Sequence, residues 1–227
     1  NKELQLKLHV FGRYGITIFA LSGIDIALWD IIGKIEKKSI AELLGGLKVE
    51  SLEAYASLFL YDDPKATADV SSKAVNDGYK IIKLHENKIP PILSSREAIG
   101  DLPLMVDVNC VWSEEDIKKI ITPLKESNLY WLEEPLWPPE NYKGLSKLRD
   151  EGFTIASGEN SCTAHQFAEM ISNNASDILQ PSVTKVGGIS EIIKINNLKL
   201  KNSRIVPHSP YFGPGFMATL QIIGSLT

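Results

Sequence analysis

The sequence predicts an α/β fold of the (β/α)8 TIM-barrel type, and two patterns support this class. Short apolar runs alternate along the chain with stretches whose apolar residues recur at helical spacing. Such alternation is typical of βα units around a parallel sheet. Acidic residues also stand at a constant interval after three of the apolar runs. A doubly wound sheet is the structural alternative.

The first element that we expect is a buried helix between residues 19 and 44. Its apolar residues recur at helical spacing, and Gly45 and Gly46 then supply a stop. The residues that form this pattern are Ala20, Leu21, Ile24, Ala27, Leu28 and Ile31.

Seven strands, with helices between them, follow along the chain. The strand-like runs cover residues 53–58, 80–85, 104–108, 130–133, 154–157, 177–180 and 204–207. Helix-period apolar residues lie between them, as in 64–76, 113–126, 141–150, 163–172 and 188–200. Repeats of roughly 25 residues fit a (β/α)8 barrel with one strand unaccounted for. Because an open arc of seven strands would leave an apolar edge, we expect residues 1–227 to be one partial barrel.

Composition narrows the kind of partner. The 227 residues carry a net charge of −4 and a pI near 5.6, so no basic field is present to hold nucleic acid or an anionic membrane surface. We see neither a stretch of about 18 uninterrupted apolar residues nor a signal peptide. Two cysteines, Cys110 and Cys162, make no disulfide framework and indicate a reducing compartment. We therefore expect a cytoplasmic protein that binds a small molecule.

Three acids mark the ends of successive predicted strands. Asp107 and Glu133 are 26 residues apart, and Glu159 follows Glu133 by another 26. Because the strands of a barrel end at one mouth, the three carboxylates should converge there. A single acid in such a place often caps the next helix, but three in phase indicate a shared role. Carboxylates that repel one another need a cation, and oxygen ligands suit Mg²⁺ before Mn²⁺.

Longer motifs resemble a known family. Residues 20–30 read Ala-Leu-Ser-Gly-Ile-Asp-Ile-Ala-Leu-Trp-Asp, and residues 43–46 read Leu-Leu-Gly-Gly. Together with the three acid motifs, a Lys-Val-Gly-Gly turn at 185–188 and a Val-Pro-His strand end at 206–208, the chain resembles the mandelate racemase and muconate lactonizing enzyme family of the enolase superfamily.

The resemblance implies a Mg²⁺-dependent enzyme that removes a proton next to a substrate carboxylate. In this family pattern Asp107, Glu133 and Glu159 bind the ion, with Asn109 close by. The ion offsets the charge that builds up on the oxygens of the enediolate intermediate. Members also have an α+β capping domain and a further barrel strand, which we expect to be largely absent from this chain. Because members commonly form dimers or octamers, we expect a homo-oligomer.

Lys83 and His85 are candidates for acid or base chemistry at the end of the second predicted strand. Spaced by two, they point to one face of that strand. The family usually has Lys-x-Lys here, with the second lysine as the base, and His85 takes that position in this chain. We predict that His85 is the acid/base and that Lys83 pairs with the substrate carboxylate. Without the family context, a structural imidazole would be the more common role for such a histidine.

His208 ends the seventh predicted strand and aligns with the second base of many members. Those members support that base with an aspartate, whereas this chain has Ser182 at the corresponding position. A serine can orient an imidazole but cannot raise its basicity as a carboxylate does. We therefore expect His208 to act mainly as a general acid that protonates a leaving hydroxyl. Lys185 either reaches the barrel mouth or is a solvated lysine of its turn.

The pairing of one base with one acid favours loss of water over racemisation. We therefore expect a Mg²⁺-dependent dehydratase that acts on a sugar acid. A racemase or epimerase, or a cycloisomerase, is the alternative on the same intermediate. A barrel that binds a carboxylate ligand without turnover is the alternative from another class, and the three mutually repelling acids argue against it.

Overall fold

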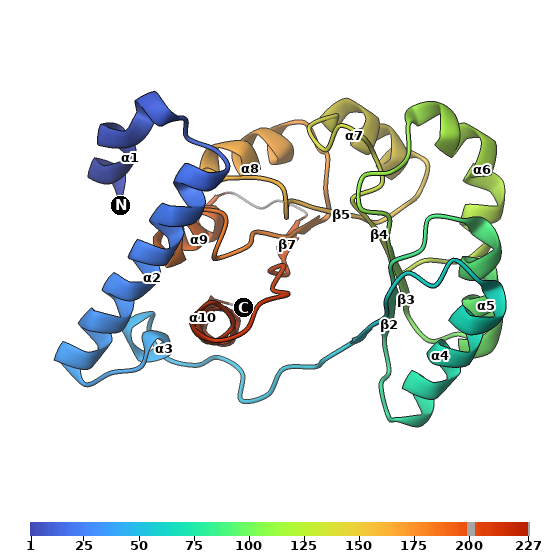
Figure 1. The fold of residues 1–227 in the computed structure, drawn as a ribbon, viewed down its shortest axis with the longest axis horizontal. Coiled ribbons are helices and arrows are strands. Elements are labelled where there is room, and N and C mark those ends of the chain that lie inside the picture. Colours follow the sequence, from blue (N-terminus) through green and yellow to red (C-terminus); the bar gives the residue numbers. More distant parts are fainter. Residues whose placement is uncertain (199–202, 227) are drawn as a thin grey trace. The chain divides into compact units, whose positions relative to one another are not determined.

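The structure is a computed structural model that describes residues 1–198 and 203–226, and it divides into two compact units. The central unit contains residues 53–157 and 173–176. The terminal unit contains residues 1–52, 158–172 and the described residues from 177 onward. Figure 1 shows the order of the elements along the chain.

The central unit alternates strands and helices. Its elements are β1 Ala56–Ser57, α4 Pro64–Asn76, β2 Ile82–Leu84, α5 Ile89–Ile99, β3 Leu104–Asp107, α6 Glu114–Glu126, β4 Trp131–Glu133, α7 Tyr142–Asp150 and β5 Ile155–Ser157. The five strands are parallel, and each pairs with the next along the chain. Helices α4, α5 and α6 lie along one side of β2, β3 and β4 (Figure 1). This is the βα arrangement that the sequence pattern predicts.

The strand register sorts the side chains of the central unit onto two faces. Leu84, Val106 and Leu132 occupy paired positions on three neighbouring strands and are each fully buried. Because side chains alternate along a strand, the next residues point to the opposite face. Asp107 and Glu133 are such residues and are paired with each other across β3 and β4.

The terminal unit combines two strands with the remaining described helices. Its elements are α1 Lys2–Leu8, the 3-10 helix η1 His9–Phe11, α2 Ile16–Glu36, α3 Ile40–Leu43, α8 Thr163–Ser172, β6 Ile178–Leu179, α9 Ile189–Asn196, β7 Arg204–Ile205 and α10 Pro214–Leu226. Strands β6 and β7 pair in parallel. Ile18 and Leu21 of α2 form a buried cluster with Cys162. Leu4 and Leu8 of α1 pack against that cluster.

Polar groups clamp α2 to the start of α9. Ser22 Oγ accepts a hydrogen bond from the Gly187 amide at 2.8 Å, and Asp25 Oδ2 accepts one from the Ser190 amide at 2.9 Å. Gly188 has a φ of +85°, and a Cβ placed there would lie 2.4 Å from the Asp25 side chain. Asp25 therefore caps the N-terminus of α9, where a negative charge is favoured. The motif at 20–30 and the turn at 185–188 thus meet in this unit.

Helix α2, which corresponds to the helix predicted at 19–44, is shorter than predicted. It ends at Glu36, and Lys37 takes a left-handed conformation with a φ of 53°. Ser39 then starts the separate helix α3 through a capping box. The chain turns back closely at this point, since a Cβ on Gly33 would lie 2.7 Å from the Lys38 carbonyl oxygen. The prediction of one helix up to residue 44 was therefore wrong.

The buried face of α2 also differs from the prediction. Ile24, Leu28 and Ile31 are 46% to 50% exposed, whereas Ser22 and Asp25 are buried. Because α2 is apolar on most of its sides, the spacing of apolar residues does not identify the face that packs. By length and composition α2 could also cross a membrane, a test that the core helices of soluble proteins pass as well.

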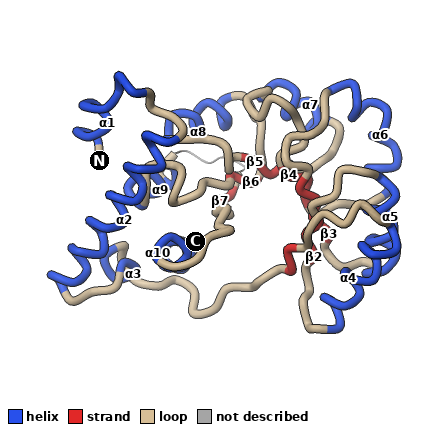
Figure 2. The backbone as a smooth tube through the Cα atoms, viewed as in Figure 1, coloured by secondary structure: helices blue, strands red, loops and turns tan. Residues whose placement is uncertain are grey.

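All seven strands lie where the sequence predicts them, but each is shorter than its apolar run. Figure 2 shows the strands as short segments among longer helices and loops. Four described helices were not among the predicted elements, namely α1, η1, α5 and α10. Helix α5 begins with prolines in its first turn, where they are tolerated. Of the predicted helix at 188–200, residues 199 and 200 lie outside the described residues.

Candidate active site

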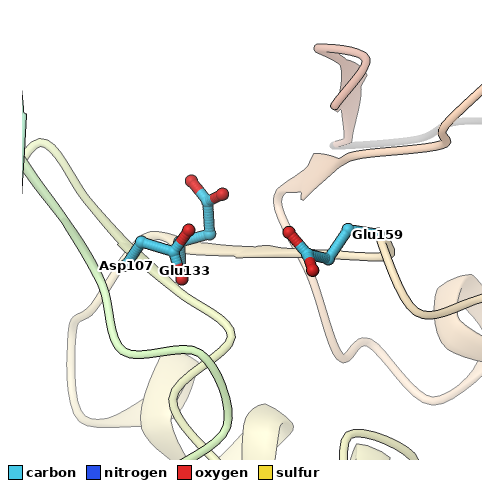
Figure 3. Close-up of side chains that lie close together, drawn as sticks. All are labelled: Asp107, Glu133 and Glu159. Carbon is cyan, nitrogen blue, oxygen red and sulfur yellow. The ribbon is translucent and has the colours of Figure 1, made fainter. Parts of the chain in front are cut away.

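Strands β3 and β4 place two carboxylates side by side. Asp107 and Glu133 are the last residues of their strands and are register partners. Both are buried, at 2% and 0% exposure. Figure 3 draws them with Glu159, which follows β5 by two residues and belongs to the terminal unit. Two buried like charges repel strongly unless a cation lies close to them.

Lys83 supplies one such positive charge within the central unit. Its ammonium lies 2.9 Å from Asp107 Oδ2 and also contacts Glu133 Oε1. Burial lowers the pKa of Lys83, but the attraction of Glu133 and Asp107 outweighs it and raises the pKa above its usual value. Burial raises the pKa of Asp107, and hydrogen bonds from His85 and Lys83 bring it below its usual range. Lys83 therefore stays charged, and it contacts the two predicted metal ligands.

His85 is held through one ring nitrogen by a backbone group. Its Nδ1 lies 2.6 Å from the carbonyl oxygen of Leu58. A carbonyl oxygen can only accept, so Nδ1 carries a hydrogen. Its Nε2 lies 3.4 Å from Asp107 Oδ2. The hydrogen bond with Asp107 raises the pKa of His85, burial lowers it, and the bond to Leu58 raises it further, for a net increase.

Two further groups orient the paired carboxylates. The backbone amide of Asn109 donates to Asp107 Oδ1 at 3.0 Å, while the Asn109 residue is exposed. The indole Nε1 of Trp131 donates to Glu133 Oε2 at 2.9 Å. Trp131 was not among the predicted site residues. It stands two positions before Glu133, so strand alternation already places both on one face.

Glu134, the neighbour of Glu133 in the sequence, is also buried. It is 2% exposed and has a φ of 42°. Its carboxylate accepts hydrogen bonds from Ser157 Oγ at 2.9 Å and from Cys110 Sγ at 3.0 Å. No periodicity marks this residue, because it lies beyond the end of β4. These contacts join the segments that follow β3 and β4 to the last residue of β5.

The terminal unit contains a histidine cluster. His208 Nε2 lies 2.9 Å from Glu159 Oε2, and His208 Nδ1 lies 2.7 Å from Ser182 Oγ. Tyr211 stands edge-on to the His208 ring, with 6.1 Å between the ring centroids. The structure thus brings together three of the predicted site residues, Glu159, Ser182 and His208.

His208 and His85 each have Nε2 next to a carboxylate, and they differ at Nδ1, where His208 contacts a serine hydroxyl and His85 a backbone carbonyl. An ionised carboxylate can only accept, so the contact with Glu159 places a hydrogen on His208 Nε2. A serine hydroxyl can either donate to Nδ1 or accept from it. The Ser182 contact is therefore compatible with both the neutral and the charged imidazole. His208 is arranged to present a proton at Nε2.

Lys185 lies in the turn that follows Ser182. Its backbone amide donates to the Ser182 carbonyl oxygen at 2.9 Å, and the residue is half-buried. Its ammonium forms no ion pair with any residue in the described ranges 1–198 and 203–226. The structure therefore shows a backbone role for Lys185 in closing this turn.

Comparison with known families identifies the family to which the chain belongs. Residues 66–227 match the model for the enolase C-terminal domain-like family. Residues 2–45 match the model for the mandelate racemase / muconate lactonizing enzyme N-terminal domain. The chain belongs to the mandelate racemase and muconate lactonizing enzyme family of the enolase superfamily. The predicted family membership is thereby confirmed.

Relatives within the mandelate racemase family have names that describe sugar-acid chemistry. The chain is 34% identical to an arabinonate dehydratase from Saccharolobus solfataricus, over 95% of this chain and 61% of the relative. It is 36% identical to a D-galactarolactone cycloisomerase from Agrobacterium fabrum, over 95% of this chain and 60% of the relative.

A solved structure confirms the fold class. The 3,6-anhydro-D-galactonate cycloisomerase from Zobellia galactanivorans matches with a TM-score of 0.91 and 28% identity, over 99% of this chain and 65% of that one. The α/β fold with parallel strands therefore corresponds to an incomplete barrel. The chain spans about three fifths of the length of the curated relatives that it matches.

Proposed function

We propose that the protein is a divalent-metal-dependent enzyme that removes the proton α to the carboxylate of a sugar acid and then expels a β-hydroxyl group. Relatives named as dehydratases and cycloisomerases support this substrate class. The observation that carries the proposal is the asymmetry between the two histidines. The Leu58 carbonyl holds a hydrogen on Nδ1 of His85, whereas Nδ1 of His208 faces the Ser182 hydroxyl, which can donate to it.

The proposed metal ligands are Asp107, Glu133 and Glu159, with Mg²⁺ preferred over Mn²⁺. All three offer hard oxygen donors, which suit either ion. Within the central unit, Asp107 and Glu133 carry two negative charges and Lys83 carries one positive charge. A net negative charge is therefore left for a further cation to neutralise. Glu159 follows the end of β5 by two residues, which span at most about 7 Å. When bound, the ion stabilises the negative charge that develops on the substrate carboxylate.

The proposed base is Nε2 of His85. Because the Leu58 carbonyl holds the hydrogen on Nδ1, the neutral ring has its lone pair on Nε2. This nitrogen takes the α-proton, and the electron pair of the C–H bond moves into the enediolate. Lys83, which lies beside Asp107, is proposed to pair with the substrate carboxylate as that charge builds. Asn109 contributes through its amide, which holds Asp107 in place.

The proposed acid is His208. The enediolate electrons re-form the carbonyl, the bond between the β-carbon and its oxygen breaks, and His208 Nε2 gives its proton to the departing hydroxyl. Water leaves, and the remaining enol tautomerises to a 2-keto acid. Ser182 keeps the imidazole in place at 2.7 Å and supplies no charge. The hydrogen on His208 Nε2 makes this residue the proton donor in the proposal, and an acid at this position favours elimination over racemisation or epimerisation. Lys185 contributes by closing the turn behind Ser182.

A cycloisomerase is the second candidate, supported by the cycloisomerase names among the relatives. If the oxygen on the β-carbon belongs to a ring of the same substrate, the same bond breakage opens that ring and no water is lost. The chemistry of the two histidines is unchanged. Only the substrate decides between the two outcomes.

The test uses the complete enzyme with Mg²⁺ and a library of sugar acids and their lactones. We expect a 2-keto acid product from at least one member and none from H85N. The control H165N changes a histidine that is exposed on α8 and should keep wild-type activity. Exchange of the α-proton in D2O without a keto acid would instead indicate racemase chemistry. Absence of turnover together with absence of bound divalent metal would indicate a carboxylate-binding barrel.

The cellular setting belongs to the same proposal. The relatives are named as an arabinonate dehydratase and a D-galactarolactone cycloisomerase. We propose a cytoplasmic homo-oligomer, a dimer or an octamer, with no nucleic-acid or membrane partner. Light scattering of the purified complete enzyme measures the number of subunits. A monomer at micromolar concentration would contradict this part of the proposal.

A further inference from the structure

Glu86 is a buried carboxylate that the chemistry above does not use. It follows His85 in the chain and is 0% exposed. Its Oε1 accepts hydrogen bonds from the amides of Tyr61 at 2.9 Å and Asp62 at 3.3 Å, and from Thr67 Oγ1 at 3.1 Å. Its Oε2 has no hydrogen-bond partner. One oxygen of Glu86 thus makes all of its hydrogen bonds.

The loop at residues 59–62 depends on these bonds because little else holds it. Phe59 and Leu60 are 80% and 54% exposed, so burial of apolar surface contributes little there. The ion pair between Lys88 and Asp62 is exposed and is worth little. Among the described residues, Glu86 is the acceptor for both hydrogen-bonded amides of this loop.

The start of this loop carries the group that orients His85. Leu58 donates its amide to the Lys83 carbonyl at 2.8 Å, and its own carbonyl lies 2.6 Å from His85 Nδ1. That carbonyl shares a planar peptide unit with the amide of Phe59. The direction of the Leu58 carbonyl is therefore set by the course of the chain into the loop.

We propose that Glu86 is a positioning residue for His85. By anchoring the loop, Glu86 fixes the Leu58 carbonyl, and the carbonyl fixes the orientation of the His85 ring. This inference rests on the proposed role of His85 as the base. Glu86 also lies at the N-terminal turn of α4, as its bond to Thr67 shows, where the helix dipole favours a negative charge. The location explains how a buried carboxylate is tolerated without a basic partner.

The experiment compares E86A, E86Q and the control S71A in the complete enzyme. A glutamine can place its amide oxygen where Oε1 lies and keep the three hydrogen bonds, whereas alanine loses them. The control S71A removes a buried hydroxyl on the same helix α4 as Thr67. That hydroxyl is hydrogen-bonded to Ser95 of α5 and does not contact the loop. The S71A substitution therefore lowers the stability of the folded protein without removing a hydrogen bond of Glu86.

The first measurement is the ring 15N chemical shift of His85 at fixed pH. The chain has four histidines, so selective labelling and the H85N spectrum assign the signals. We expect E86A to shift or broaden the His85 ring signals, and E86Q and S71A to leave them in place. Unchanged signals in a folded E86A would overturn the proposal. This readout needs no turnover, so it separates a failure here from a failure of the proposed reaction.

The second measurement is steady-state kinetics. We expect kcat of E86A to fall about 10- to 100-fold with KM changed far less, because a displaced base slows the proton transfer and not binding. E86Q should recover most of this loss. If E86A does not fold, T67V removes one of the three bonds and should lower kcat in the same direction by a smaller factor. Wild-type kcat in T67V would then contradict the proposal.

Discussion

The contact of Lys83 with two buried carboxylates leads to a prediction about the metal-free protein. Replacing Lys83 by methionine keeps much of the side-chain volume but removes the positive charge. Asp107 and Glu133 are then left in a buried place with no cation between them. Loss of one partner from a buried ion pair costs about 3–5 kcal/mol. We therefore expect K83M to lower the free energy of unfolding by this amount in the absence of divalent metal.

Addition of Mg²⁺ should reverse part of this loss. A ligand that binds only the folded state at 100 times its Kd stabilises that state by about 2.7 kcal/mol. Lys83 repels a cation placed beside it, so the gain from Mg²⁺ should be larger in K83M than in the wild type.

Urea unfolding of both proteins in EDTA and in excess Mg²⁺ measures these four free energies. The matched control is K73M, which removes an exposed pair with Asp77 on α4. Exposed pairs of this kind are worth about 0.3–0.5 kcal/mol. The reasoning is refuted if K83M is no less stable than K73M in EDTA, or if Mg²⁺ stabilises the wild type more than K83M.

The difference between the wild type and K83M should also depend on pH. The pKa of Asp107 is lowered in the folded protein below its ordinary value of 3.8. A group with a depressed folded pKa contributes stability above its unfolded pKa and loses it as pH falls through the folded pKa. In K83M the same carboxylates are buried without the ammonium, which raises their pKa values, so they take up protons at a higher pH than in the wild type. We therefore expect the difference to be largest near neutral pH and to begin shrinking above pH 3.8 as the pH falls. A difference that stays constant from pH 7 down to pH 3.8 would assign it to another group.

Two further predictions concern the terminal unit. The variant S182D places a carboxylate beside His208, which makes the imidazole a better base. We expect it to raise the ratio of α-proton exchange to keto-acid formation in D2O, as measured by proton NMR. An unchanged ratio would show that the partner of Nδ1 does not direct the reaction. G188A should lower the free energy of unfolding by about 2–4 kcal/mol, since it combines a left-handed φ with a clash against Asp25. Its control G23A, with nothing within 4 Å of the new Cβ, should raise the same quantity by about 0.5–1 kcal/mol, and equal melting curves for the two variants would contradict this account.

The repeating part of the fold was predictable because each βα unit carries its own pattern. Asp107 and Glu133 could be placed on neighbouring strand ends from their interval alone, and they are register partners in the structure. Strand lengths were not predictable in the same way, since an apolar run continues into buried loop residues. Val108, for example, is buried but lies beyond β3.

The groups that orient the site were harder to predict than the groups proposed to react. His85 was singled out by its position and residue type, but its partner is a backbone carbonyl, which the sequence does not reveal. Glu86 and Glu134 are buried acids with no periodic signal, because each lies just after a strand. Helix α2 has apolar residues on most of its sides, so the sequence did not reveal that Ser22 and Asp25 lie on the face that packs inside the unit.

The clamp between α2 and α9 affects how variants of this protein should be interpreted. Asp25 contacts the backbone where α9 begins and lies in the most recognisable motif of the chain. A substitution of Asp25 would reduce the amount of protein that folds, while each molecule that does fold would retain normal turnover. Slow growth of a strain that carries such a variant would then reflect a low amount of enzyme. The specific activity per folded molecule distinguishes this case from a substitution of His85, which lowers turnover itself.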